Sequence, residues 1–249
     1  GNIEQNPVES IANFIEDAGQ ILSEEGMDQE ADECYGFSSD IRNGLVIETD
    51  IELVNFLHGI GEVLLEIEDF PMATDIFEEE KLLRTEYFPA DAALVVSLHA
   101  LGSLLLNVGD HERSLATFLE EIDVRKELDG PDNLDVANTL DIVGALYLEN
   151  GDHSAALDCF SEVARIQKIH LGEEHENVAE TLYSIGLILL SLTDHQEALY
   201  AFRQVVGIRQ KTRGRQDTSV GDALNISGFL EAKCGNKEQA LRFLTKALG

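Results

Sequence analysis

Histidine is the residue type in this chain best suited to binding a metal or to exchanging protons. Three histidines, His111, His153 and His195, lie 42 residues apart, and each directly follows an aspartate. Spacing this regular indicates successive structural units, which are separated by at least one helix diameter, on the order of 10 Å. The three imidazoles therefore cannot share one ion, and we interpret them as residues at helix starts.

The remaining candidate groups do not favour catalysis either. His58 and His99 occupy one repeat position in neighbouring units, and Glu62, one helical turn from His58, completes at most a weak metal site. The carboxylates of residues 78–80 are expected on an exposed helix surface. The chain contains no GxxxxGK, GxGxxG or HExxH motif. We therefore predict that it is not an enzyme and needs neither cofactor nor metal.

The three cysteines are odd in number and form no CxxC pair. Cys34 and Cys159 share one repeat position, just before a large side chain, and Cys234 lies at the end of an expected helix. This usage predicts free thiols and an intracellular reducing compartment, in the cytoplasm or in an organelle after processing. Which compartment that is, the sequence does not say.

The elements that carry these residues are repeated. A glycine recurs every 41 or 42 residues, a small side chain follows it after twelve residues, and a large one follows four residues later. Self-similarity at this period indicates a solenoid of stacked units, each in contact only with its neighbours. The glycines are Gly19, Gly61, Gly102, Gly144, Gly186 and Gly228, and the large residues are Tyr35, Phe77, Phe118, Phe160, Phe202 and Leu244.

Each unit reads as two helices joined by a tight turn. In residues 135–172, apolar side chains spaced by three or four residues form two helical stripes, and Gly151 separates them. The recurring glycine in the first helix predicts close approach of the second helix. The residues expected to N-cap the second helices are Asp69, Asp110, Asp152, Asp194 and Asn236, whereas Met27 in the first unit predicts a weaker cap.

The small residue and the Ala-x3-Phe pattern, as in Ala156 to Phe160, resemble the tetratricopeptide repeat. The period and the loops at 124–136 and 166–178 resemble the 42-residue variety of kinesin light chains. The pattern departs from the family at Leu140 and Leu182, where an aromatic residue is usual. The resemblance implies an all-α, right-handed α-solenoid of six helix-turn-helix repeats in a single domain, residues 1–249. The expected repeats are approximately 10–51, 52–92, 93–134, 135–176, 177–218 and 219–249.

The resemblance also implies a binding surface, because the first helices of such arrays line a concave groove that holds a peptide or helix of a partner. The groove here is polar and acidic, so we expect a basic or amphipathic protein segment and do not carry over the family's carboxylate clamp. The groove residues implied are His58, His99, Asn138, Asp141, Glu180, Tyr183, Leu187, Asp222, Asn225 and Phe229.

The net charge of −31 is unevenly distributed. Residues 1–202 contain 44 of the 48 acidic and 8 of the 17 basic residues, whereas residues 203–249 have a net charge of +5. Such a surface repels nucleic acid and anionic membranes, and no apolar run is long enough to span a bilayer. A basic loop stands out, and it either pairs with acidic neighbours in the array or binds an acidic or phosphate-rich partner. Its cations are Arg209, Lys211, Arg213 and Arg215.

We therefore predict a non-enzymatic protein-interaction scaffold or adaptor. The alternative is a constitutive structural or assembly subunit of a larger complex. The last helix bears on this choice, because its apolar residues Leu241, Leu244 and Leu248 are not followed by a polar capping helix. We expect further repeats, a partner or self-association to cover them.

Overall fold

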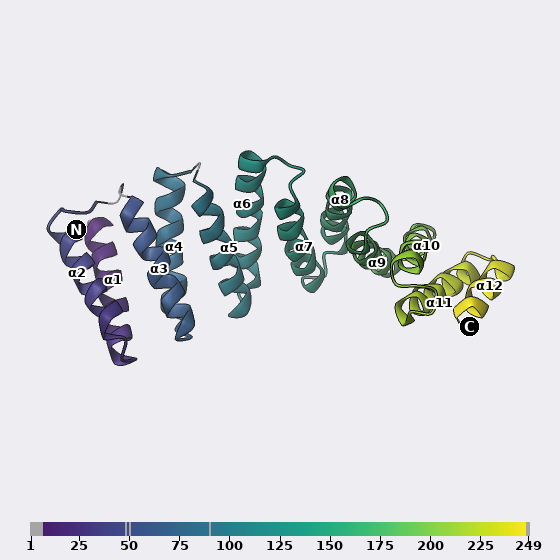
Figure 1. The fold of residues 1–249 in the computed structure, drawn as a ribbon, viewed down its shortest axis with the longest axis horizontal. Helices are drawn as coiled ribbons and strands as arrows, with labels where there is room; N and C mark the ends of the chain where they lie inside the picture. Colours follow the sequence, from purple (N-terminus) through teal and green to yellow (C-terminus); the bar gives the residue numbers. More distant parts are fainter. Residues whose placement is uncertain (1–6, 48, 50, 90, 248–249) are drawn as a thin grey trace. The chain divides into compact units, whose positions relative to one another are not determined.

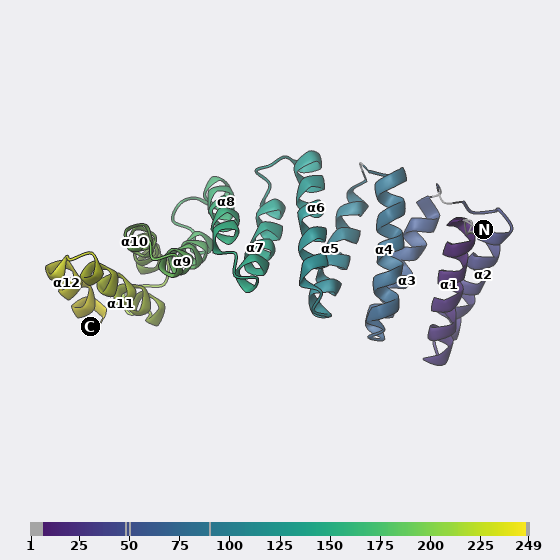
Figure 2. The same ribbon diagram turned by 180° about the vertical axis from the view of Figure 1, so that it is seen from behind.

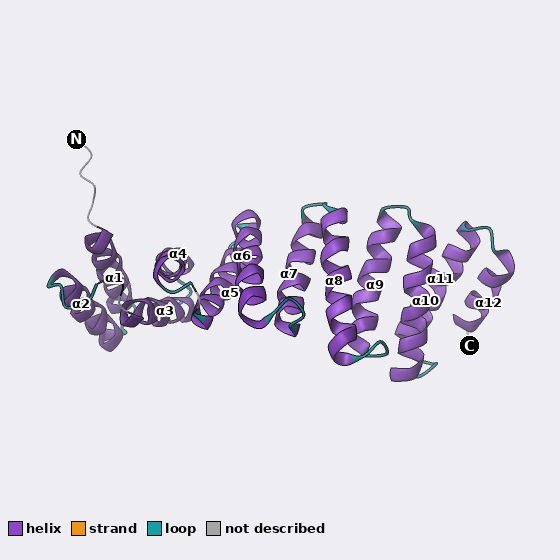
Figure 3. Ribbon diagram, turned by 90° about the horizontal axis from the view of Figure 1, so that it is seen from above, coloured by secondary structure: helices purple, strands orange, loops and turns teal. Residues whose placement is uncertain are grey.

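The computed structural model describes residues 7–47, 49, 51–89 and 91–247, and Leu248 lies outside these described residues. Within them the chain forms twelve α-helices and no strand (Figures 1 and 3). The predicted all-α solenoid of helix pairs is confirmed. Among the described helices, none is both long and apolar enough to cross a membrane.

The chain divides into two compact units, residues 1–124 and 125–249. In each unit, consecutive helices pair as antiparallel hairpins, which Figure 2 shows from the opposite side. The helices that begin in the first unit are α1 (Pro7–Glu24), α2 (Asp28–Arg42), α3 (Ile51–Glu66), α4 (Phe70–Tyr87), α5 (Ala92–Asn107) and α6 (His111–Asp129), whose last residues belong to the second unit. The second unit continues with α7 (Leu134–Glu149), α8 (His153–Leu171), α9 (Glu176–Ser191), α10 (His195–Thr212), α11 (Thr218–Lys233) and α12 (Lys237–Ala247).

The recurring glycine and the large residue of each unit are in direct contact. A Cβ atom added to Gly61 would lie 2.7 Å from Cζ of Phe77, and one added to Gly144 would lie 2.9 Å from Cε2 of Phe160. The ring of the second helix therefore occupies the space beside the first helix that a side chain at the glycine position would fill. The predicted packing role of the glycine is confirmed. The four phenylalanines at this position are buried: Phe77, Phe118, Phe160 and Phe202.

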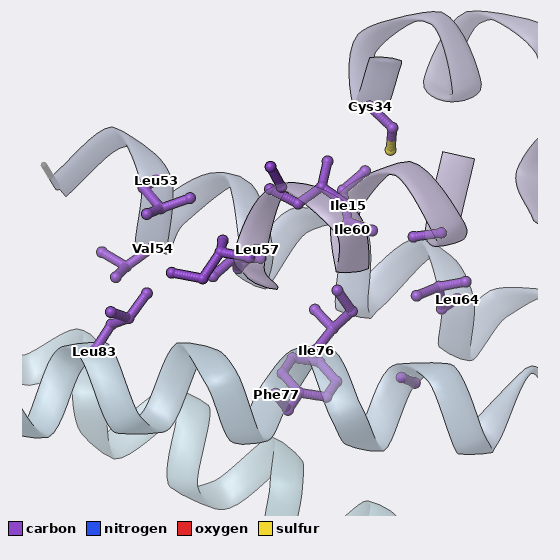
Figure 4. Close-up of a cluster of buried hydrophobic side chains, with 14 of the residues drawn as sticks. Ile15, Cys34, Leu53, Val54, Leu57, Ile60, Leu64, Ile76, Phe77 and Leu83 are labelled. Atoms are coloured by element: carbon purple, nitrogen blue, oxygen red, sulfur yellow. The ribbon is translucent and has the colours of Figure 1, made fainter. Parts of the chain in front are cut away.

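The first and last repeats pack this position less completely, because Tyr35 and Leu244 are both 39% exposed. Between these ends the buried apolar side chains form one large cluster in the first compact unit and separate clusters in the second. Figure 4 shows part of the cluster in the first compact unit, in which Leu57 and Ile60 of α3 lie among Ile15 of α1 and Phe77 of α4.

The turns inside the hairpins follow the expected capping pattern. The carboxylates of Asp69, Asp152 and Asp194 each accept a hydrogen bond from a backbone N–H in the first turn of the following helix, as does that of Asp110. Met27 makes no side-chain cap, as predicted. These hydrogen bonds satisfy N–H groups that have no partner inside the helix.

A second feature of these turns is a left-handed residue just before the capping position. Four hairpins use glycine here, but Glu68 and Thr193 adopt the same conformation, each with φ of 62°. The glycines are Gly26, Gly109, Gly151 and Gly235. A non-glycine residue in this region costs roughly 1–2 kcal/mol.

Candidate protein-binding surface

Four of the predicted groove residues meet in one hollow of the second unit. This α7–α9 hollow has a volume of about 400 Å³ and lies between α7, α9 and the C-terminal part of α8. Its volume is at the lower end of the range for small-ligand sites. The predicted residues in its wall are Asn138, Asp141, Glu180 and Tyr183, and they are joined by Ala137, Gln167, Asn177, Thr181 and Ser184.

A separate hollow of about 480 Å³ lies beside α11 and contains Asp222, Asn225 and Arg215 together with Lys246. The two apolar groove residues line neither hollow. Leu187 is 45% exposed and Phe229 is 52% exposed. The structure therefore distributes the predicted residues of the second unit over two polar hollows and two exposed apolar side chains.

His58 and His99, in the first unit, are committed to contacts inside the array. Nδ1 of His58 lies 3.1 Å from Oε2 of Glu80, and Nδ1 of His99 lies 3.1 Å from Oε2 of Glu121. The hydrogen bond to Glu80 raises the pKa of His58 above its ordinary value. Both glutamates are completely buried. Within the part of the chain described, His, Cys, Asp and Glu form no group of three that could hold a metal.

The expectation that residues 78–80 form an exposed acidic surface is wrong. Glu80 is fully buried and accepts hydrogen bonds from Arg84 Nε (2.7 Å) and from Ser97 Oγ (2.5 Å). Glu79 is half-buried, and this burial raises the pKa of its carboxyl group. Glu80 therefore links α4 to α3 and α5 instead of facing solvent.

The basic segment also differs from the expected loop. Arg209 and Lys211 belong to the last turn of α10, and Arg209 is only 4% exposed. Lys211 pairs with Glu174, and the guanidinium of Arg213 lies 2.7 Å from Glu180 Oε1. These cations are engaged within the array, and any partner that uses them must replace these pairs.

Ion pairing changes the charge of the α7–α9 hollow. Glu180 is neutralised by Arg209, whose Nη2 lies 2.8 Å from Glu180 Oε2, and by Arg213. The Arg209 guanidinium also stacks over the Tyr183 ring, 5.0 Å from its centroid. The carboxylate that stays uncompensated is Asp141, which has no ion-pair partner among the described residues. Desolvation by the surrounding protein raises the pKa of Asp141.

The sequence expectations did not include a further repeated position, seven residues after the large side chain. We call it the arginine position, because four repeats have arginine there and one repeat has Gln167. Its 41- and 42-residue spacing is visible in the sequence, but its role is visible only in the contacts. The four arginines are Arg42, Arg84, Arg125 and Arg209.

In three repeats the arginine contacts a residue of its own hairpin. This residue lies six positions before the recurring glycine, on the predicted groove side of the first helix. Nη2 of Arg42 donates to Asn13 Oδ1 (2.7 Å), and Nη2 of Arg84 donates to Asn55 Oδ1 (2.9 Å). Arg209 makes the equivalent bond to Glu180. The second helix therefore supplies a guanidinium that binds the polar groove position of its own hairpin.

Comparison with known proteins agrees with this architecture. Residues 94–169 and residues 179–212 each match a tetratricopeptide repeat family model. No match to the chain was found among curated proteins.

Solved structures are similar at low sequence identity, and so they bear on the fold alone. BtubC (BKLC) from P. vanneervenii is 15% identical with a TM-score of 0.57, over 99% of this chain and 90% of that one. A putative kinesin light chain of Podosopora anserina with nearly identical TPR-like repeats is 15% identical with a TM-score of 0.58, over 78% of this chain and 92% of that one. YrrB, a TPR protein with an unusual peptide-binding site, is 18% identical with a TM-score of 0.52, over 81% of this chain and 86% of that one.

The helix spacing is consistent with the 42-residue variety of the repeat found in kinesin light chains. Repeats of this type generally act as non-enzymatic modules that bind other proteins. The chain therefore contains tetratricopeptide repeats at residues 94–169 and 179–212, and its fold is the one that solved structures of such repeat proteins share.

Proposed function

We propose that this chain is a scaffold or adaptor whose second unit binds a partner segment carrying lysine or arginine across the first helices α7, α9 and α11. The observation that carries the proposal is the α7–α9 hollow, where Asp141 presents a carboxylate without a cationic partner from the described residues. A basic side chain of the partner compensates this charge. Charge-assisted hydrogen bonds of this kind contribute about 1.5–3 kcal/mol.

Exposed apolar side chains next to the hollows supply the remaining affinity. Phe229 is 52% exposed, and Lys233 Nζ lies over its ring at 5.4 Å from the centroid. Half-buried Tyr183 packs edge-on against Phe202. Aromatic residues in such positions dominate binding energy in many interfaces. A peptide-binding TPR protein, YrrB, is among the structural neighbours, which supports the class of function but not the ligand.

The test is selection of random twelve-residue peptides on the wild-type chain, followed by affinity measurements on two double variants. We expect enrichment of lysine and arginine, and at least about thirtyfold weaker binding by Tyr183→Ala with Phe229→Ala, as for loss of a hot spot of about 2 kcal/mol. The matched control is Tyr200→Ala with Leu241→Ala, which removes exposed apolar side chains from second helices.

Circular dichroism must show unchanged helicity in both variants. Equal affinity of the groove variant and wild type, or selected peptides without basic residues, contradicts the proposal.

A specific observation favours the alternative of a structural subunit. Leu241 on α12 is 67% exposed, whereas Leu199, its equivalent one repeat earlier, is 7% exposed and packs in a cluster with Leu230 of the following repeat. A neighbouring helix therefore covers this position inside the array. Light scattering across a range of protein concentrations distinguishes the two functions: concentration-dependent association that Leu241→Lys abolishes supports the subunit, and a constant monomer mass supports the adaptor.

A further inference from the structure

The fourth repeat, formed by α7 and α8, has no arginine at the arginine position, and this repeat forms part of the α7–α9 hollow. Gln167 stands there, and its Oε1 accepts a hydrogen bond from Thr181 Oγ1 of α9 at 2.9 Å. The groove residue of this unit, Asn138, is therefore in a different situation from Asn13 and Asn55, which each accept from an arginine. Among the described residues, no guanidinium contacts Asn138 or Asp141.

We propose that the α7–α9 hollow accepts the guanidinium group of an arginine from the bound protein segment, in the place that the repeat's own arginine takes in three other repeats. This inference rests on the proposed function and specifies its ligand. The partner completes, from outside, an interaction that Arg42 and Arg84 make within the chain.

The acceptors of the hollow fit this group. Asn138 donates through Nδ2 to Asp135 (3.5 Å), which leaves its carbonyl oxygen available, the atom type that binds arginine at Asn13 and Asn55. Asp141, one turn further along α7, offers the compensating carboxylate. A guanidinium carries five N–H donors in a rigid plane and can bind both acceptors at once.

The charges that line the hollow are balanced by the binding of one cation. Glu180 already has Arg209 and Arg213 as partners, so the net charge left at the hollow is that of Asp141. The hollow, at about 400 Å³, is also large enough for a planar group and its alkyl stem. A lysine ammonium is compact and more strongly hydrated, and we expect it to bind more weakly at dispersed carboxamide and carboxylate oxygens.

Because the natural partner is not identified, the test uses two defined probes, acetyl-Gly-Arg-Gly-amide and its lysine counterpart. Nitrogen-15 NMR of the full chain follows the backbone amides of Asp141, Gln167 and Thr181 during titration. We expect the arginine probe to shift these amides with a dissociation constant at least about fivefold lower than that of the lysine probe. Asp141→Asn weakens the arginine probe by about tenfold or more.

The decisive variant is Gln167→Arg, which provides the guanidinium from within the chain and is compatible with the fold, since four other units carry arginine there. We expect it to abolish binding of the arginine probe while the midpoint of unfolding stays equal or rises. The matched control Gln196→Arg adds the same charge at an exposed site of α10 and should leave binding unchanged.

The outcomes separate this inference from the proposed function. If Gln167→Arg binds the arginine probe as wild type does, or if both probes bind equally, the inference is overturned, although selected basic peptides still support a groove scaffold. If basic peptides are not selected at all, the proposed function fails first. Loss of the arginine probe in Asp141→Asn and in Gln167→Arg, but not in Gln196→Arg, supports the inference.

Discussion

Gly59 and Gly61 of α3 differ in the free space beside them, and this space determines the effect of adding a methyl group at each position. A Cβ atom at Gly61 would meet three atoms of the Phe77 ring at 2.7, 2.8 and 3.0 Å, whereas a Cβ atom at Gly59 has no atom within 4 Å. Both lie in the interior of the same helix. Replacing either glycine with alanine gains about 1 kcal/mol of helix propensity. The difference between the two variants therefore reports packing alone.

The cost at Gly61 follows from the surroundings of the ring. Ordinary carbon contacts are about 3.5–4.0 Å, so the Phe77 ring would have to move by on the order of 1 Å. It is fully buried and packs edge-on against His58, with centroids 5.7 Å apart. Overpacking of this kind costs about 1–3 kcal/mol. We expect Gly59→Ala to stabilise the chain by about 1 kcal/mol and Gly61→Ala to destabilise it by up to about 2 kcal/mol.

Urea unfolding followed by circular dichroism at 222 nm measures both changes against wild type. The second unit offers an independent replicate, because a Cβ atom at Gly186 lies 2.7 Å from Phe202 and one at Gly207 meets nothing within 4 Å. If Gly61→Ala and Gly186→Ala stabilise the protein as much as Gly59→Ala and Gly207→Ala do, the packing explanation of the recurring glycine is refuted.

Three further predictions concern the buried polar groups. Arg84→Met, which leaves the buried carboxylate of Glu80 without its guanidinium, should lower the free energy of unfolding by about 3–5 kcal/mol. The exposed-pair control Arg165→Met should lower it far less, because solvent screens that pair; equal losses would contradict the burial argument. The pKa of His58 is raised in the folded state, so its protonated form stabilises the fold fully below about pH 6.5, and this contribution is lost as pH rises through the folded-state pKa. Urea unfolding should therefore show a larger free energy of unfolding for wild type than for His58→Gln near pH 6, and a smaller difference near pH 8.5. A pH-independent difference would disprove this prediction. Burial raises the pKa of Cys34 to about 12, so a thiol reagent should label this residue only after unfolding, and labelling of the native chain would contradict its placement.

The parts of the fold that could be predicted are those that recur at a fixed spacing. The contact between Gly144 and Phe160 was predictable because six units repeat the same size pattern, and the helix start at Asp152 because an aspartate follows the turn in four of them. Such features depend on local chain geometry. They require no knowledge of which side chains meet across hairpins.

Polar contacts between helices were not predictable in the same way. Glu80 stands in a run of three glutamates, and its burial depends on Arg84, Ser97 and His58, which arrive from three different helices. Likewise, the acidity of Glu180 suggested an available anion, but Arg209 neutralises it from α10. Charge counted along the sequence therefore overestimates the charge that this surface presents to a ligand.

The left-handed turn residues Glu68 and Thr193 have a consequence for how the array opens. Their conformation stores roughly 1–2 kcal/mol that the glycine turns do not store. Since local opening begins where stability is lowest, amide hydrogens beside these two turns should exchange with solvent faster than those beside Gly109 and Gly151. Thr193 lies just beyond the C-terminal end of α9, so transient loosening is expected at the end of that helix opposite to Glu180 and Tyr183, which belong to the proposed binding surface.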